Sequence, residues 1–80
     1  MNRKIRLVWD FYGDLAEGTA KHHLIHLEEF MQREALPFYN QGISTEAELH
    51  ALAFLTVDEK DVIPLRDTLK PNRAFVEKMD

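Results

Sequence analysis

The sequence predicts a small α+β domain in which four strands form one sheet and two helices pack against it. The longest apolar run is residues 49–57, and an acidic stretch ends it abruptly. Its nine residues are long for a strand, yet too few for a helix that lacks a polar face. Side chains of a strand alternate between two faces, and both faces of this run are largely apolar. We therefore expect a central strand that is covered on both sides.

Residues 4–12 predict the first strand. They are rich in β-branched and aromatic types, and Gly13 closes the segment. Apolar positions alternate with a more mixed set, and the apolar ones are Ile5, Leu7, Trp9 and Phe11. This period of two indicates that the apolar set faces the helices.

A long amphipathic helix should follow Asp14 and run to about Glu34. Asp14 and Glu17 have the spacing of a capping box, in which the first side chain accepts from free amides of the first turn. Pro37 ends the helix, because the residue before a proline favours extended geometry. One broad stripe of the helix should face the sheet, and it contains Ala16, Ala20, His23, Leu24, Leu27, Phe30 and Met31.

Residues 38–43 favour a short edge strand with Gly42 as a bulge, and a hairpin turn near residues 45–48 should lead from it into the central strand. A single helical turn at residues 45–48 is the alternative, because that segment also has capping-box spacing.

A second helix should follow the central strand, with Asp58 or Asp61 as its cap, and run to about residue 70. Pro64 fits the first turn of such a helix, where its missing N–H is not needed. Residues 73–77 then predict a last strand at the edge of the sheet.

This order of strand, helix, strand, strand, helix and strand resembles the ferredoxin-like split βαβ superfold. The resemblance covers the whole chain and depends on element order alone. It implies that the first and third strands are central, parallel neighbours and that both helices lie on one face of a four-stranded antiparallel or mixed sheet. Likeness at the level of a superfold carries no function by itself.

Size points to self-association. The 80 residues form one domain, and a core of that size seldom supplies more than about 3–5 kcal/mol of net stability. The chain has no cysteine, so neither disulfides nor metal-bound thiolates can add to it. Oligomerisation is the remaining common way for a small domain to gain stability, and we expect a homodimer.

Charge and hydropathy exclude several partners. The net charge of −4 argues against a general nucleic-acid binder, which needs a basic stripe. No run approaches the ~18 apolar residues of a membrane span, and no apolar segment of a secretory signal follows the charged start. The default expectation is a cytoplasmic protein without a cofactor.

The face of the sheet away from the helices predicts an interface. It should carry Arg6, Val8, Asp10, Tyr12, His50, Leu52, Phe54 and Thr56. Covering its apolar members is worth on the order of 25 cal/mol per Å², and an open patch of this kind marks an interface. We expect a homodimer that packs sheet to sheet through Val8, Leu52 and Phe54. The alternative is a monomer in which residues 38–48 fold over this face.

Asp10, Tyr12 and His50 are the candidate ligand-binding residues on that face. Parallel central strands would place His50 beside Lys4 or Arg6, several residues from Asp10 and far beyond the ~3 Å of a hydrogen bond. Antiparallel strands would allow His50 to face Asp10 or Tyr12. On the parallel arrangement we expect a structural His50 at the end of its strand, although a small-molecule ligand near Tyr12 stays open.

The predicted long helix carries a candidate metal site. His22, His26 and Glu29 are spaced i, i+4 and i+7, on one side of the helix, and imidazole with carboxylate suits a divalent metal. A solvated helix flank explains the same spacing, and we favour that interpretation.

Three functions follow from these patterns. The first is a non-catalytic homodimer with a binding or regulatory role. The second is a small dimeric α+β-barrel enzyme that uses His50 or Tyr12 with Asp10 in an inter-sheet pocket. The third is metal binding by the histidine-rich helix. The chain has no phosphate loop or nucleophile motif, so catalysis is left undecided.

Overall fold

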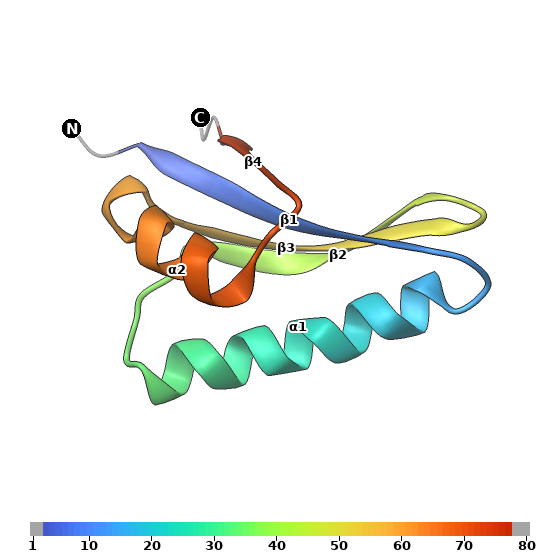
Figure 1. Ribbon diagram of the computed structural model, residues 1–80, viewed down its shortest axis with the longest axis horizontal. Coiled ribbons are helices and arrows are strands. Elements are labelled where there is room, and N and C mark those ends of the chain that lie inside the picture. Colours follow the sequence, from blue (N-terminus) through green and yellow to red (C-terminus); the bar gives the residue numbers. More distant parts are fainter. Residues whose placement is uncertain (1–2, 78–80) are drawn as a thin grey trace.

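The computed structural model of the protein describes residues 3–77 as an α+β fold with a four-stranded antiparallel sheet. Both helices lie on one side of this sheet (Figure 1). In chain order the elements are β1 (Lys4–Tyr12), α1 (Ala16–Arg33), β2 (Asn40–Ala47), β3 (His50–Asp58), the short 3-10 helix η1 (Glu59–Asp61), α2 (Val62–Leu69) and β4 (Arg73–Val76). The strand order is β2-β3-β1-β4, so β1 and β3 are central.

The two central strands run antiparallel, and the expectation of parallel neighbours is wrong. Lys4 pairs with Asp58 at one end of the β1–β3 ladder, and Tyr12 pairs with His50 at the other. The connections explain this direction. Helix α1 carries the chain back along the sheet, so that β2 runs parallel to β1, and the tight hairpin then reverses β3.

Strand β3 is central and mostly buried, as its two apolar faces predict. Its Ala51, Ala53, Leu55 and Val57 belong to the core beneath the helices. We call the opposite side of the sheet the open face. Alternation and strand pairing place on it Arg6, Val8, Asp10 and Tyr12 of β1, His50, Leu52, Phe54 and Thr56 of β3, and Arg73 and Phe75 of β4.

The core lies between the sheet and the two helices. Four residues of the predicted stripe of α1 are buried, namely Ala16, Ala20, Leu27 and Met31. Leu65 of α2 joins the same cluster, and the Trp9 indole N–H donates to the Leu69 carbonyl at 2.8 Å. That hydrogen bond fixes the end of α2 to β1. No helix within residues 3–77 is long and apolar enough to cross a membrane.

Helix α1 begins one residue later than a cap at Asp14 predicts, and it has no capping box. Leu15 is the N-cap residue, and no side chain caps the helix. The start is set by the turn before it, because Gly13 has a φ of 107°, which favours glycine. Gly13 also donates its amide to the Leu49 carbonyl and accepts from the Ala16 amide.

Strand β2 confirms the edge strand and the hairpin, but it covers residues 40–47 and so begins and ends later than the predicted residues 38–43. The register shift lies between Thr45 and Ala47, and not at Gly42 as predicted. Because this segment pairs with β3 inside the sheet, the alternative in which it folds over the open face is wrong.

Candidate functional site

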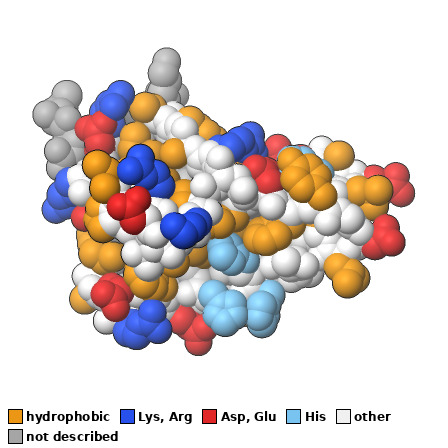
Figure 2. All heavy atoms as spheres, viewed as in Figure 1, with side chains coloured by type: hydrophobic (Ala, Val, Ile, Leu, Met, Phe, Trp, Pro, Cys, Tyr) orange, Lys and Arg blue, Asp and Glu red, His pale blue; other side chains and the backbone are white. Residues whose placement is uncertain are grey.

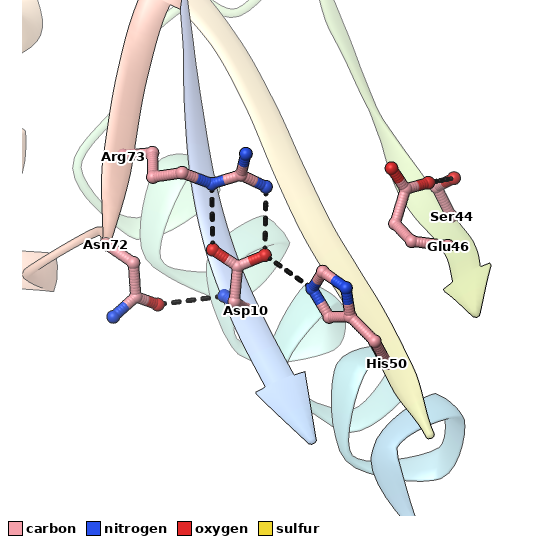
Figure 3. Close-up of polar contacts among 6 residues, drawn as sticks. All are labelled: Asp10, Ser44, Glu46, His50, Asn72 and Arg73. Atoms are coloured by element: carbon pink, nitrogen blue, oxygen red, sulfur yellow. Dashed lines mark hydrogen bonds and ion pairs between the residues drawn. The ribbon is translucent and has the colours of Figure 1, made fainter. Parts of the chain in front are cut away.

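A polar network centred on Asp10 occupies one end of the open face (Figure 3). Arg73 of β4 donates to both carboxylate oxygens at 2.9 Å, which is the bidentate geometry of strong pairs. From the other side His50 of β3 approaches Oδ1 through Nε2 at 2.8 Å. Asn72 accepts the Asp10 backbone amide at 2.8 Å. One carboxylate of β1 therefore joins the two neighbouring strands of the sheet.

The network keeps Asp10 ionised. Only 8% of the Asp10 side chain is exposed, and this burial opposes ionisation and is the largest single influence. The hydrogen bonds from His50 and Arg73, together with their charges, outweigh it and lower the pKa of Asp10 below its ordinary value.

An ionised carboxylate accepts hydrogen bonds only, so Nε2 of His50 must carry the hydrogen that lies between the two groups. The Tyr12 ring stacks on the imidazole, with centroids 4.4 Å apart and planes 14° from parallel. Tyr12 itself is 74% exposed. Within residues 3–77 no side chain forms a hydrogen bond to Nδ1 of His50. This nitrogen is consequently available to a ligand.

The antiparallel register creates the contact that the sequence analysis disfavoured. Tyr12 lies directly opposite His50, so Asp10 is two positions from that pair on the same face. Sequence reasoning placed Asp10, Tyr12 and His50 on this face but missed Arg73 and Asn72. Both follow α2 in the chain, and only the pairing of β4 with β1 brings Arg73 opposite Val8.

The network mainly holds the neighbouring strands together. Both oxygens of Asp10 are already paired with Arg73, which limits their use as a proton acceptor. The nearby Ser44 hydroxyl donates to Glu46 and does not contact His50 (Figure 3). The described residues therefore supply a histidine with an orienting carboxylate but no nucleophile bonded to it.

The predicted interface residues form the middle of the open face. Val8 and Leu52 are only 1% and 6% exposed in the single chain, whereas Phe54 is partly exposed. Phe54 and Arg73 flank Val8 on the neighbouring strands, which accounts for its burial. The Arg6 guanidinium lies 4.0 Å above the centre of the Phe54 ring. Long side chains thus cover part of the apolar surface that the sequence places here.

Three of the four histidines lie on α1, where pale-blue side chains gather in Figure 2. His22 and His26 approach each other at 3.0 Å between their Nε2 atoms, and His26 Nδ1 lies 3.7 Å from a Glu29 oxygen. Within residues 3–77 no group of three histidines or carboxylates is placed to hold a metal ion. His23 points instead to the sheet, against Trp9 and Phe11.

A groove of about 340 Å³ lies at the β4 edge of the sheet. It is lined by Arg3, Ile5, Glu59, Val62, Ile63, Ala74, Phe75 and Val76. Arg3 and Glu59 pair with each other, and the remaining lining residues are apolar. None of Asp10, Tyr12 and His50 borders this groove, so it is separate from the polar network.

Comparison of the chain with protein-family models, with curated proteins and with solved structures finds no match.

Proposed function

We propose that the protein has the ferredoxin-like superfold and acts as a non-catalytic homodimer that packs through its open face, with a binding or regulatory role. The element order and the strand order β2-β3-β1-β4 support the fold, because the antiparallel strand β3 separates the parallel strands β1 and β2, as in a split βαβ unit. The dimer is supported by one observation above all: both helices lie on the other side of the sheet, and no helix of residues 3–77 covers the open face (Figure 1).

Aromatic groups on this face supply the area for contact. Tyr12 and Phe75 are exposed, and Phe54 is partly exposed between them and β2. Aromatic side chains with a polar end are enriched where two proteins meet. Val8 and Leu52 form the floor beneath these groups, so that they contribute shape more than newly buried area.

The test is the replacement Phe54→Asp. A charge in the middle of a sheet-to-sheet contact is left without water, which costs several kcal/mol when it is unpaired. In the single chain the new carboxylate lies beside Arg6, so the fold should survive. Light scattering should show that the assembled mass falls by half relative to the wild type, and circular dichroism should stay unchanged.

Ile25→Asp is the matched control, because Ile25 is an exposed apolar residue of α1 and lies away from the open face. It should leave the mass as it is. A wild-type protein that is monomeric at high concentration, or a folded Phe54→Asp variant of unchanged mass, would overturn the proposal.

A small dimeric enzyme is the second candidate, and the His50–Asp10 hydrogen bond favours it. A carboxylate that orients a histidine is the supporting half of many nucleophilic sites. The missing nucleophile would then come from a second copy across the open face. A fluorophosphonate probe tests this directly: labelling that is lost in His50→Gln supports catalysis, and absence of labelling in the assembled wild type counts against this serine-type mechanism.

Metal binding by His22, His26 and Glu29 has the weakest support, because the structure brings two imidazoles together without a third ligand. Zinc that stays bound to His26→Ala after dialysis would exclude this site.

A further inference from the structure

Among residues 3–77, no strand pairs with the outer edge of β4. β4 is one edge strand of the sheet, next to β1, and β2 is the edge strand on the other side (Figure 1). The Glu77 amide donates to the Lys4 carbonyl, so Glu77 faces β1. Backbone groups of an antiparallel strand alternate in direction, and therefore Phe75 and Arg73 also face β1. The N–H and C=O groups of Ala74 and Val76 point out of the sheet.

This edge is also apolar. Ala74 and Val76 line the groove of about 340 Å³ beside α2, and Ile63 forms part of its wall. Ile63, Phe75 and Val76 are all exposed. Natural edge strands commonly carry lysine or proline, which discourage pairing. The segment Ala74–Val76 carries neither, so both its backbone and its side chains suit the addition of a further strand.

Strand β4 can pair with a second copy of itself in one antiparallel register. Arg73, Phe75 and Glu77 share the open face, where Arg73 pairs with Asp10 and Glu77 pairs with Arg6 of the same chain. If two such strands pair antiparallel with Phe75 opposite its own copy, Arg73 lies opposite Glu77 of the other strand at both ends. Ala74 then lies opposite Val76 on the groove side. Both charges are already held by ion pairs inside each chain, so the pairing depends on the outward backbone groups and on the side chains of Ala74 and Val76.

The direction of the hydrogen bonds selects the same alignment. Around a two-fold axis at Phe75, the outward groups of Ala74 fall opposite those of Val76 in the second copy, and each pair can exchange both hydrogen bonds. We propose that two copies of the chain pair through β4 in this register and form one continuous eight-stranded sheet. A contact that uses the same patch on both copies closes at two and does not propagate.

This contact does not depend on packing through the open face, because it uses the outward backbone groups of Ala74 and Val76, although Phe75 borders both surfaces. The strand is four residues long, so the area is smaller than the ~1,600 Å² of a standard interface. We therefore expect a dimer of modest affinity, measured best at high protein concentration.

A single cysteine tests the register, because the chain has none of its own. In the proposed dimer Phe75 faces its own copy in a non-hydrogen-bonded pair, with Cα atoms about 4.5 Å apart, which suits a disulfide. Phe75→Cys should form a covalent dimer under mild oxidation. Ala74→Cys is the matched control, because the two copies of that position are offset by two residues along each strand and lie beyond disulfide reach.

The cross-link should persist in the Phe54→Asp background, which separates edge pairing from packing through the open face. Loss of the cross-link in that background, equal cross-linking of Phe75→Cys and Ala74→Cys, or no cross-link in a folded Phe75→Cys protein would each overturn the proposal.

Hydrogen exchange of the wild type gives a second measurement that needs no substitution. The Ala74 and Val76 amides point outward, so only edge pairing protects them. For a dimer well above its dissociation constant, the monomer fraction falls about tenfold when the concentration rises about hundredfold. Exchange of both amides should slow by that factor. Exchange rates that do not depend on concentration would contradict the pairing.

The substitution Val76→Pro should remove the concentration dependence at Ala74. Proline is tolerated where a strand N–H points away from the sheet, so this variant should fold. Phe75→Pro is its control, because it removes an N–H that faces β1 and should destabilise the fold itself. If Val76→Pro folds and Ala74 keeps its protection, the proposal fails.

Discussion

His23 is the histidine of α1 that the fold uses. Its ring lies against Trp9 and Phe11, with centroids 5.3 Å and 5.5 Å away. Its Nε2 atom is buried and has no hydrogen-bond partner in the structure. Burial lowers the pKa of His23 below its ordinary value of 6.5, and the charges of His26 and His22 lower it further. The folded protein consequently prefers a neutral His23.

We predict that His23 makes the protein less stable as the pH falls below about 6.5. The unfolded chain binds a proton there before the folded chain does, so the free energy of unfolding rises with pH in this window. The substitution His23→Leu removes this proton and the unpartnered nitrogen, and should stabilise the protein by about 1 kcal/mol at neutral pH and by more at pH 5. Urea denaturation at a series of pH values measures both effects.

Asp10 provides the internal comparison for that experiment. Its pKa is lowered from 3.8, so the stability it contributes is present above that value and is lost only as the pH falls below it. The His23→Leu protein should therefore keep its acid transition below about pH 3.8. If the free energy of unfolding of the variant changes with pH between 5 and 7 as steeply as that of the wild type, His23 is not the source of this pH dependence.

At the scale of elements, Gly42 explains how the two strands of the hairpin pack on the open face. A Cβ at this position would lie 3.0 Å from Cζ of Phe54, the residue directly opposite on β3. Phe54 is held in turn under the Arg6 guanidinium. Glycine is present here because a ring from the neighbouring strand crosses its backbone.

We predict that Gly42→Val destabilises the protein by about 1–3 kcal/mol, because its branched side chain collides with the Phe54 ring. The double variant Gly42→Val with Phe54→Ala should recover part of this loss, since the colliding group is gone. Chemical denaturation of the four proteins of this cycle gives the coupling energy. Strictly additive effects would show that the ring does not restrict this position.

The bounds of an element could be predicted where the apolar residues repeat regularly over a long segment of the sequence. Strand β1 has the predicted bounds, and β3 is shifted by one residue. The start of α1 was not predictable from the spacing of Asp14 and Glu17. The backbone of Gly13 instead pairs with Leu49, which is distant in sequence, and that contact determines where the helix begins.

At the scale of the whole molecule, the direction of the strands decides the site. Periodicity identified the residues of the open face, but it is the same for parallel and antiparallel neighbours. Only the hairpin between β2 and β3 brings His50 to Asp10. Arg73 depends on a further long-range pairing, between β4 and β1. The sequence therefore predicts which residues share a face more reliably than which residues touch.

The two proposed contacts give different assemblies. Packing through the open face stacks one sheet on another, whereas pairing through β4 extends a single sheet. If both form, Phe54→Asp and Val76→Pro should each leave dimers that are held by the remaining contact. Together they should leave a folded monomer.

The chain has one tryptophan, and its position gives the protein an optical reporter of its own. The indole of Trp9 is 4% exposed and is tied to the last turn of α2, while the His23 imidazole lies against its ring. Release of α2 would admit water to the indole and shift its emission to longer wavelength. A charged imidazole so close to the ring would quench that emission. The fluorescence spectrum of Trp9 thus reports both the docking of α2 and the protonation of His23, without any added dye.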